Sequence, residues 1–375
     1  MRVAFVSTFP PLRCGIGTYT EMLAEALAGK GAEVVVLTER SVGEVNRRDL
    51  RVIPCFDSKR GFVEPVLREV EEAQPDVVHI QHDYTRYSPP ERFLELLDGL
   101  SDRRVFVTMH AVLTRETSDY HPYCEELNHG IGERANIIVH QETARRVLLR
   151  IGVPPRRVRV IPHGTLHLSH RPDKRGCFNL PEERPVLAQF GFLKEQKQVH
   201  ISIRAMPLIL ERCPKAFLFI GGSVHPYYEK DRRYHDYVDR CLGLIEELGL
   251  SDNVFLLNDF LSKERLERSI CSADVLLFPE KMNYWSVSGM LHLALGARKP
   301  VVAARSPKFE EVSRYISDEL LFTPGDYKQL AKIAVRLLRD PQFSRAIRGR
   351  ISRFASRTSW DRVAEMHLRA YSRPR

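Results

Sequence analysis

The sequence predicts an α/β fold with two doubly wound parallel sheets, and three observations support this prediction. Short runs rich in valine, isoleucine and leucine recur along the chain, and each run is continuous, as expected for parallel strands that are buried on both faces. Helical patterns lie between the runs, which is the alternation of right-handed crossover units. The chain has 375 residues, and at roughly 100 to 200 residues per domain this length predicts two domains.

The first series of strands and helices precedes a polar stretch. Amphipathic helical patterns occupy residues 18–31, which end on glycine, and residues 63–75, which end on proline. The apolar runs predict strands at 2–7, 33–38, 76–80, 104–109, 136–140 and 157–161. All of these runs fit one parallel sheet.

The second series begins after residue 184, where the same alternation restarts. The apolar runs there predict strands at 185–191, 216–222, 253–257, 274–279 and 299–304. We therefore expect a first domain at 1–168, a linker at 169–184 and a second domain at 185–355. Doubly wound domains bind ligands at the carboxyl ends of their strands, so we expect the two edges to face each other across a cleft that holds the ligand.

The formal net charge of +9 is regional, because basic residues gather in 142–160 and in 343–375. Aromatic residues that could stack on bases are sparse among these charges, so we do not expect a nucleic-acid partner. Two interpretations stay open at this point. The charges belong to solvated helix faces, or they bring a peripheral protein to an anionic membrane surface, where the acceptor would be lipid-linked.

The seven cysteines are scattered singly, without the paired spacing of a zinc or redox site. Their odd number and wide spacing suit a reducing compartment. The first residues lack the basic start, long apolar centre and cleavage site of a signal peptide. No stretch approaches the roughly 20 apolar residues of a membrane span, so we expect a cytoplasmic protein.

The stretch STFPPLRCGIGTYTEML, residues 7–23, places two glycines just before a helix. In the dinucleotide-binding fingerprint the first glycine follows its strand at once, and a third glycine completes the pattern. Here seven residues separate Ser7 from Gly15, and Thr20 takes the place of the third glycine. This spacing favours a lid and acceptor wall at Gly15 and Gly17 over a nicotinamide site.

Three histidines follow predicted strands of the first domain, namely His82, His110 and His163. A single histidine at such a place is often a structural residue, and that alternative stays open for each of them. Three at equivalent positions favour function, because loops at the carboxyl edge of such sheets carry binding and catalytic residues.

Polar residues also follow the strands of the second domain. Ser286, Ser288 and Gly289 lead into a helix, where backbone N–H groups and hydroxyls favour a bound anion. Lys197 follows the first strand of this domain and could supply the countercharge. The alternative for Lys197 is an exposed helical lysine.

The order and spacing of these motifs resemble the retaining nucleotide-sugar glycosyltransferases of the GT-B fold, in particular family 4 (glycosyl transferases group 1). The resemblance covers nearly the whole chain, in two Rossmann-like domains. It rests on FPPLRCGIGTYTEMLAEAL, TMHAV, VPPRRVRVIPHGT, FGFLKEQKQ, FLFIGGSVHP, SGMLHLALGARKPVVAA and SWDRVAEMHLRAY, among other stretches. The last of these, within 356–375, resembles the final helix of the fold, which crosses back to the first domain.

The resemblance implies an enzyme that moves a hexose of the mannose or glucose type from a nucleoside-diphosphate sugar to a hydroxyl acceptor. The donor would be GDP-mannose or a UDP-sugar, and the acceptor a glycan, a lipid-linked sugar or a small polyol. The donor would bind the second domain and the acceptor the first. It implies no cofactor. We also expect metal independence, because no Asp-x-Asp pair stands at the end of a predicted strand.

Site residues carry over position by position. His110 matches the histidine that contacts the transferred sugar, and Lys197 matches the lysine that pairs with the diphosphate, so both are expected to be catalytic. Cys14, His82 and His163 are expected on the acceptor side. The expected donor-binding residues are Gly15, Gly17, Phe192, Lys197, Gly222, Ser223, Phe260, Ser286, Ser288 and Gly289.

The sequence departs from the family pattern in two places. Phe192 stands where an arginine commonly follows the glycine, so one cation for the diphosphate is missing. The two glutamates that many members carry fall on Asn283 and Leu291, and Glu280 lies three residues before the first of them, so we give Glu280 no role. The serine and glycine pattern instead resembles a sub-group that lacks the paired glutamates.

Retaining transfer requires stabilisation of the leaving diphosphate, for which we expect Lys197 and the helix start at Gly289 to act. No carboxylate of the first domain is an obvious nucleophile, which favours a front-face displacement. Three alternatives stay open: a nicotinamide-dependent oxidoreductase that binds ribose at Glu39, a catalytically silent nucleotide-sugar-binding homologue, and a GT-B epimerase that acts on a nucleotide sugar.

Overall fold

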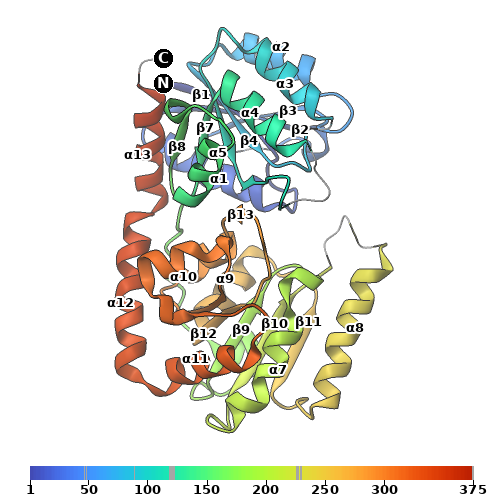
Figure 1. Cartoon of the computed structure of the whole chain (residues 1–375), viewed down its shortest axis with the longest axis vertical. Helices are drawn as coiled ribbons and strands as arrows, with labels where there is room; N and C mark the ends of the chain where they lie inside the picture. Colours follow the sequence, from blue (N-terminus) through green and yellow to red (C-terminus); the bar gives the residue numbers. More distant parts are fainter. Residues whose placement is uncertain are drawn as a thin grey trace. The chain divides into compact units, whose positions relative to one another are not determined.

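A computed structural model describes residues 1–45, 47, 49–87, 89–117, 123–224, 228 and 230–373. The chain forms two compact units (Figure 1). Unit 1 comprises Met1–Gly164, Tyr284–Gly289 and Thr358–Arg375. Unit 2 comprises Thr165–Asn283 and Met290–Arg357. Each unit contains its own parallel sheet, which confirms the predicted fold class.

The sheet of unit 1 has seven parallel strands in the order β3-β2-β1-β4-β5-β7-β8. The interior strand β1 pairs through Val3 with Val34 on one side and with Val77 on the other. The continuous valine-rich runs form these strands because both faces of the sheet are buried. The strands are β1 (Arg2–Val6), β2 (Glu33–Glu39), β3 (Arg51–Phe56), β4 (Val77–His82), β5 (Val105–Met109), β7 (Asn136–Val139) and β8 (Val158–Val160).

Helices cover this sheet, and α1 begins at Gly15, directly after the long glycine loop. The buried core beneath them contains Val66, Phe93 and Leu148. The helices of unit 1 are α1 (Gly15–Ala28), α2 (Val63–Ala73), α3 (Pro90–Gly99), α4 (Cys124–Arg134), α5 (Glu142–Arg150) and α13 (Trp360–Tyr371).

A second, two-stranded sheet joins distant parts of the sequence within unit 1. The strands β6 (Ala111–Val112) and β13 (Trp285–Ser286) pair antiparallel. Trp285 lies opposite Val112, and Ser286 lies opposite Ala111. Residues 284–289, expected in the second domain, therefore belong to unit 1.

The final helix α13 packs against α1 in unit 1 (Figure 1). The hydroxyl of Tyr371 is 2.5 Å from Nδ1 of the buried His79, and Nε2 of His79 is 2.7 Å from Oγ1 of Thr108. Burial is the main cause that holds the pKa of His79 well below 6.5, and the nearby His367 lowers it further, so the ring is neutral. In a neutral ring one nitrogen donates and the other accepts, so Tyr371 and Thr108 together use both ring nitrogens of His79.

The sheet of unit 2 has six parallel strands in the order β11-β10-β9-β12-β14-β15. The central strand β9 pairs with β10 on one side and with β12 on the other. The strands are β9 (Val186–Phe190), β10 (Phe217–Gly222), β11 (Val254–Asn258), β12 (Val275–Phe278), β14 (Val301–Ala304) and β15 (Leu321–Phe322).

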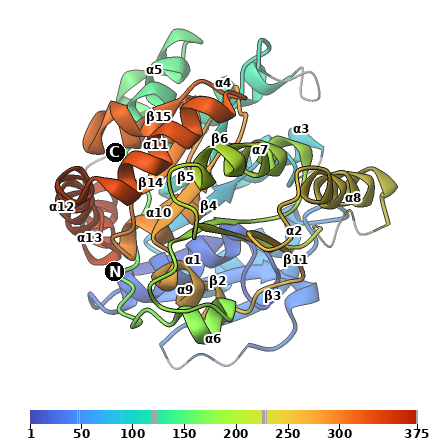
Figure 2. The ribbon, with the colours of Figure 1, turned by 90° about the horizontal axis from the view of Figure 1, so that it is seen from below.

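Helices flank this sheet, with α7 beside α11 and α6 beside α9 (Figure 2). The first residue of α10, Gly289, belongs to unit 1, and the rest of α10 belongs to unit 2. The helices are α6 (Lys174–Phe178), α7 (Val199–Leu210), α8 (Arg232–Glu247), α9 (Lys263–Ser272), α10 (Gly289–Gly296), α11 (Tyr327–Arg339) and α12 (Pro341–Arg357).

Residues 169–184, expected as a linker, pack within unit 2 and contain α6. Lys174 is buried, and its Nζ donates to the carbonyl oxygens of Glu182 and Arg184. It also forms an ion pair of 2.9 Å with Asp274, just before β12. Buried hydrogen bonds of this kind fix the segment to the domain that follows it.

The helix α10 is held by a buried polar chain inside unit 2. Nε2 of His292 lies 3.0 Å from Oε2 of Glu311, and Nδ1 lies 2.8 Å from Oγ1 of Thr165. Because a carboxylate only accepts, Nε2 donates to Glu311. This series of hydrogen bonds joins α10 to Thr165, the first residue of unit 2.

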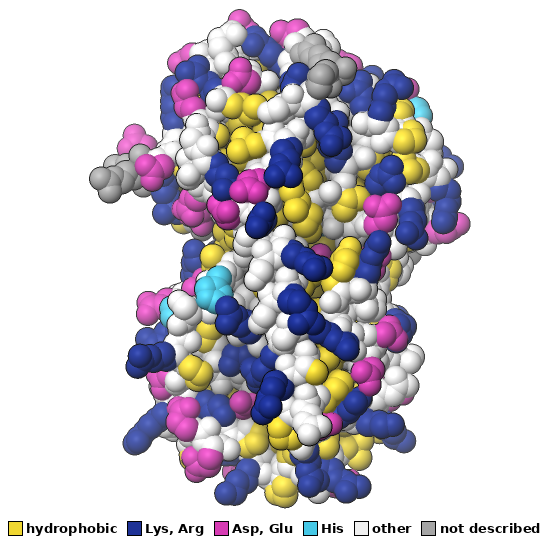
Figure 3. Space-filling view, turned by 90° about the vertical axis from the view of Figure 1, so that its left-hand side faces the viewer, with side chains coloured by type: hydrophobic (Ala, Val, Ile, Leu, Met, Phe, Trp, Pro, Cys, Tyr) yellow, Lys and Arg dark blue, Asp and Glu magenta, His cyan; other side chains and the backbone are white. Residues whose placement is uncertain are grey.

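The helix α12 carries five arginines and no acidic residue. Figure 3 shows many Lys and Arg side chains on the face that carries this helix. Among the described residues, no helix is both long and apolar enough to cross a membrane.

The buried bond between Tyr371 and His79 generates a stability prediction. Replacing Tyr371 with Phe leaves Nδ1 of His79 without its hydrogen-bond partner, so we expect unit 1 to lose about 1 to 3 kcal/mol of unfolding free energy. Trp285 and Trp360, the two tryptophans of the chain, both lie in unit 1, so tryptophan fluorescence during urea unfolding reports on this unit. An unchanged unfolding midpoint would contradict the prediction.

Candidate functional site

Lys197 lies in a short 3-10 helix, Glu195–Lys197, between β9 and α7. The side chain of the buried Gln189 fixes its main chain, because Nε2 of Gln189 donates to the carbonyl oxygen of Lys197 at 2.8 Å. The amide of Gln189 is in turn held by Oγ of Ser202, which donates to its Oε1 at 2.7 Å. Lys197 is therefore positioned from β9 and α7 together.

Two glycines allow close packing around this lysine and the loop before it. Gly191 has a φ of +132°, a conformation that L side chains rarely adopt, and a Cβ there would lie 3.2 Å from Nζ of Lys197. A Cβ on Gly222 would lie only 1.9 Å from the carbonyl oxygen of Gly191. Close packing of the loop after β9 on the end of β10 therefore requires glycine at 222. This gives Gly222 a packing role; its expected donor-binding role stays a prediction.

A carboxylate that sequence reasoning passed over is the centre of the unit 2 site. Oε1 of Glu280 lies 2.5 Å from Nζ of Lys197, and Oε2 lies 2.6 Å from Nζ of Lys308. The three side chains are 3%, 14% and 13% exposed for Glu280, Lys197 and Lys308. A single buried carboxylate thus bridges two nearly buried ammonium groups.

Burial and pairing act in opposite directions on these groups. Burial lowers the pKa of Lys197 and the charge of Lys308 adds to this, while Glu280 raises it, and the pKa is about 8. Burial alone would raise the pKa of Glu280, but the two lysines outweigh burial and lower it to about 2. At neutral pH Lys197 and Glu280 can therefore both carry their charges.

The other residues expected to bind the donor in the second domain lie around the ends of β9, β10 and β11. The N–H of Leu193 donates to the carbonyl oxygen of Ser223 at 2.8 Å, which joins the loop that carries Phe192 to the end of β10. Phe192 and Ser223 are half-buried, and Phe260 is 40% exposed after β11. His225 and Pro226, which end the quoted FLFIGGSVHP segment, lie outside the described residues.

In unit 1, His110 follows β5 and is held from two sides. Its backbone N–H donates to the carbonyl oxygen of His82 at 3.1 Å. Its Nε2 donates to Oε1 of the buried Gln81 at 2.8 Å, which leaves the lone pair on Nδ1. The ring of Tyr19 meets it edge-on, with 4.8 Å between ring centroids.

Burial holds the pKa of His110 well below 6.5, and the nearby His140, His82 and Arg86 lower it further. His110 is therefore neutral at pH 7. A neutral ring with a free lone pair can accept a hydrogen bond from a hydroxyl group. It carries no positive charge that would attract an anion.

An aromatic cluster around Tyr19 surrounds this histidine, and sequence reasoning identified only part of it. The Tyr19 ring centroid lies 5.3 Å from that of His140, 5.1 Å from that of His163 and 5.1 Å from that of Trp360. A Cβ on Gly164 would lie 2.2 Å from the Trp360 ring, so the PHG turn packs directly on α13. The turn thus has a structural role. The acceptor role expected of His163 stays a prediction.

His82 was expected to bind the acceptor, but its placement is that of a core residue. It is 1% exposed and packs against Tyr84 and Phe93, with ring centroids 5.1 and 4.9 Å apart. Burial lowers its pKa to about 4, although Asp83 acts in the other direction. We therefore do not carry His82 forward as an acceptor contact.

The two glycines of the amino-terminal loop differ in their surroundings. A Cβ on Gly17 would lie 3.3 Å from the backbone nitrogen of Phe9, so this glycine lets the loop fold back on α1. A Cβ on Gly15 would have no described atom within 4 Å, so its expected ligand role stays open. Cys14, beside it, is half-buried and accepts from the guanidinium of Arg86 at 3.2 Å.

The structure brings Ser286, Ser288 and Gly289 to the residues of unit 1 that follow β5. Ser286 pairs with Ala111, the residue next to His110. Ser288 is buried, and a Cβ on Gly289 would lie 3.9 Å from Nε2 of His163. Residues expected to bind the donor from the second domain therefore lie beside the histidines of unit 1.

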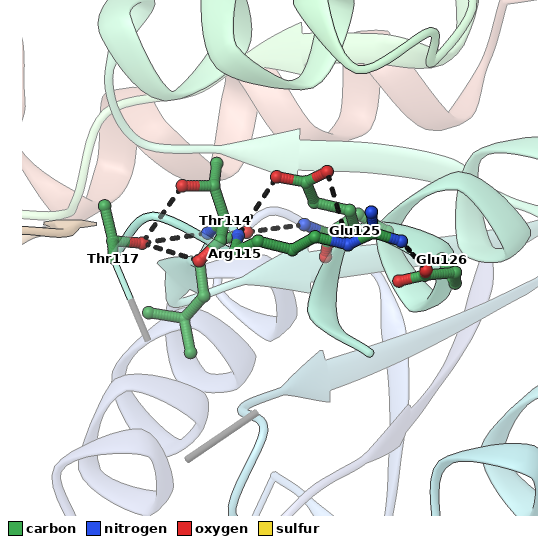
Figure 4. Close-up of polar contacts among 7 residues, drawn as sticks. Thr114, Arg115, Thr117, Glu125 and Glu126 are labelled. Atoms are coloured by element: carbon green, nitrogen blue, oxygen red, sulfur yellow. Dashed lines mark hydrogen bonds and ion pairs between the residues drawn. The ribbon is translucent and has the colours of Figure 1, made fainter. Parts of the chain in front are cut away.

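The chain after β6 is anchored to the start of α4 (Figure 4). The N–H of Thr114 donates to Oγ1 of Thr117 at 2.8 Å, and the N–H of Arg115 donates to Oε1 of Glu125 at 3.0 Å. The guanidinium of Arg115 also pairs with Glu126. These bonds fold residues 114–117 into a turn and tie Arg115 to the start of α4.

The side chains of the described residues do not form a metal site. Within the described ranges, no group of three or more His, Cys, Asp or Glu residues is placed to hold a metal ion. Metal independence stays a prediction.

The close approach of Gly191 and Gly222 can be tested by adding one methyl group. Gly222→Ala would force the Gly191 carbonyl away, and we expect a loss of about 1 to 3 kcal/mol of stability. Gly243→Ala is the matched control, because its Cβ on helix α8 meets no described atom within 4 Å and should stabilise by about 0.5 to 1 kcal/mol. Thermal unfolding followed by circular dichroism measures both, and equal shifts for the two variants would refute the packing role.

The lowered pKa of Glu280 generates a pH prediction. A carboxyl whose pKa is near 2 when folded and 4.5 when unfolded adds stability that is present above about pH 4.5 and lost as the pH falls towards 2. We expect Glu280→Gln to cost about 3 kcal/mol at neutral pH, with a smaller cost in acid. Urea unfolding between pH 7 and 3 measures this. The control is Glu264→Gln, at a glutamate that is 75% exposed, and it should change stability by less than about 0.5 kcal/mol. If Glu280→Gln lowered the free energy of unfolding by the same amount at every pH, the assignment would be contradicted.

Comparisons with known proteins agree with this architecture. Solved structures that cover 99% of this chain include the sucrose-phosphate synthase of Thermosynechococcus elongatus (TM-score 0.76, 20% identity, 98% of that chain). Others are Anabaena HepE in complex with UDP (TM-score 0.76, 17% identity, 100% of that chain) and a glycosyltransferase of Rickettsia africae (TM-score 0.76, 13% identity, 97% of that chain). At these identities the likeness shows a shared fold.

Sequence comparisons identify the family. An uncharacterized glycosyltransferase of Methanocaldococcus jannaschii is 25% identical over 244 residues, which are 63% of this chain and 59% of that relative. The Glycosyltransferase Family 4 model matches residues 14–165, and the model of glycosyl transferases group 1 matches residues 170–353. Because these two matches cover most of the sequence, the chain belongs to the GT-B glycosyltransferases of family 4, the glycosyl transferases group 1.

Proposed function

We propose that this protein is a retaining, metal-independent glycosyltransferase that moves a hexose from a nucleoside-diphosphate sugar to a hydroxyl acceptor. The observation that carries the proposal is the pair of ammonium groups that Glu280 holds at the carboxyl edge of the unit 2 sheet. Cations at such an edge suit a diphosphate, which needs its negative charge stabilised as it leaves. The neutral His110 of unit 1 suits the sugar, because its Nδ1 can accept from a hydroxyl group.

The donor is a UDP-sugar or GDP-mannose, with a hexose of the glucose or mannose type. Support for a nucleotide sugar comes from HepE, a protein of the same fold whose structures hold UDP and UDP-glucose. The acceptor is a hydroxyl group of a glycan, a lipid-linked sugar or a small polyol. No further cofactor is needed for this reaction.

In the proposed step, the bond between the anomeric carbon and the diphosphate oxygen breaks while the acceptor oxygen bonds to the same face of that carbon. The proton of the acceptor hydroxyl passes to the leaving phosphate oxygen, so atoms and charges balance. Lys197, charged below about pH 8, stabilises the leaving diphosphate. The backbone N–H groups at the start of α10 add to this stabilisation. His110 orients the sugar through its Nδ1 lone pair.

The direct test is to incubate the protein with a panel of nucleotide sugars and measure released nucleoside diphosphate and the configuration of the product. Release from one donor, with transfer to an added acceptor and retained configuration, supports the proposal. Binding of a donor without release in the presence of any acceptor would point to a silent homologue. Conversion of the donor sugar without release would point to an epimerase.

Two substitutions test the assigned roles. We expect His110→Ala and Lys197→Ala each to lower turnover by at least about 100-fold, because each removes an interaction with the transition state. Steady-state release of nucleoside diphosphate measures this. The matched controls are His129→Ala, at an exposed histidine of α4, and Lys281→Ala, at an exposed lysine after β12. Near-normal turnover in both His110→Ala and Lys197→Ala would remove the basis of the proposed mechanism.

A further inference from the structure

We propose that Lys308 is a second diphosphate-binding cation of the donor site, held there with Lys197 by the shared carboxylate of Glu280. The inference rests on the proposed function and adds to it a residue that lies outside the motifs quoted above. Three observations support it: Lys197, Glu280 and Lys308 lie together, two ammonium groups share one carboxylate, and the side chain of Phe192 carries no charge.

The three side chains come from three neighbouring strand ends. β12 pairs with β9 on one side and with β14 on the other, all in parallel. Lys197, Glu280 and Lys308 follow β9, β12 and β14 respectively. Parallel strands end at the same edge of a sheet, so these residues meet where doubly wound domains bind their ligands.

Lys308 is fixed in this position by its own segment. It is the middle residue of a short 3-10 helix, Pro307–Phe309. The next side chain, Phe309, is fully buried and packs on Phe278 of β12, with ring centroids 5.7 Å apart. The ammonium group is therefore brought to Glu280 by packing of its segment as well as by attraction.

The charges of the three groups do not balance. Two ammonium groups share a single carboxylate, and within the described part of the chain neither lysine forms an ion pair with any other acidic residue. One positive charge is thus left over in a nearly buried position, where an unpaired charge is costly. An anion with several negative oxygens, such as a diphosphate, would supply the missing countercharge.

A diphosphate also needs more than one cation. Phe192, directly after Gly191, supplies no charge to the loop that follows β9. Lys308 approaches from the other side of Glu280, because the two carboxylate oxygens each hold one ammonium group. Two separated ammonium groups can interact with two phosphoryl groups at once, whereas a monophosphate offers only one. The arrangement therefore favours nucleoside diphosphates over monophosphates.

The test compares diphosphate and monophosphate binding by calorimetry in the full-length protein. UDP and UMP are one pair of probes, and GDP and GMP are the other. For the pair that binds, we expect Lys308→Ala to weaken the diphosphate by about 10-fold or more and to change the monophosphate by less than about 2-fold. Lys281→Ala is the matched control and should leave both affinities unchanged.

Lys308→Arg keeps the charge and should retain most of the preference for the diphosphate. Circular dichroism and the unfolding midpoint check that each variant folds, which we expect because Glu280 stays paired with Lys197. The inference is overturned if Lys308→Ala keeps the wild-type preference, or if it weakens both ligands equally. In those cases a wild-type protein that still releases nucleoside diphosphate from a donor leaves the proposed function intact. A wild-type protein that prefers neither UDP nor GDP over its monophosphate would overturn both.

Discussion

The unit 2 site depends on one buried carboxylate. Glu280 lies between two lysines that would otherwise repel each other, and it raises the pKa of Lys197, which burial lowers. Gly191 serves the same arrangement, since it leaves open the space in which the ammonium group of Lys197 lies, while Gly222 lets Gly191 approach the end of β10. Replacement of Gly191 would therefore act on the charges as well as on the packing.

Unit 1 presents a different kind of chemistry. Burial lowers the pKa of His82 and of His110 below 6.5, so both are neutral at pH 7, and they lie with other histidines among aromatic rings. The ring of Tyr19 meets three of these histidines and also Trp360 of the last helix. This neutral aromatic cluster differs in kind from the cationic edge of unit 2, which suits an anion.

The sequence alone was sufficient to predict the fold class. Every valine-rich run that indicated a strand forms one, because a strand buried on both faces needs a continuous apolar run. The strand β3 escaped notice because RVIPCF begins with a charge and contains a proline, as an edge strand can. The pairing of β6 with β13 could not be foreseen either, since two-residue strands far apart in sequence carry no periodic signal.

The site was predictable only in part, for a related reason. Lys197 and His110 could be named because they follow strands at positions that a known motif marks, although their roles are still to be measured. Glu280 and Lys308 follow strands too. The spacing of the family's paired glutamates gave Glu280 no role, and no quoted motif includes Lys308. Their meeting depends on which strands are neighbours, and strand order cannot be read from spacing. His82 shows the opposite case, because a strand-end position does not reveal that Tyr84 and Phe93 enclose the ring.

The route of the chain has a consequence for how this protein can be divided. The backbone passes between the two units four times, at Gly164, Asn283, Gly289 and Arg357. A recombinant fragment that stops at Gly164 would lack the strand that pairs with β6 and the helix that covers Gly164 and His79. Its apolar surfaces would be left bare, which favours aggregation. A chimera that exchanges halves between relatives must therefore carry residues 284–289 and the last helix along with the amino-terminal half.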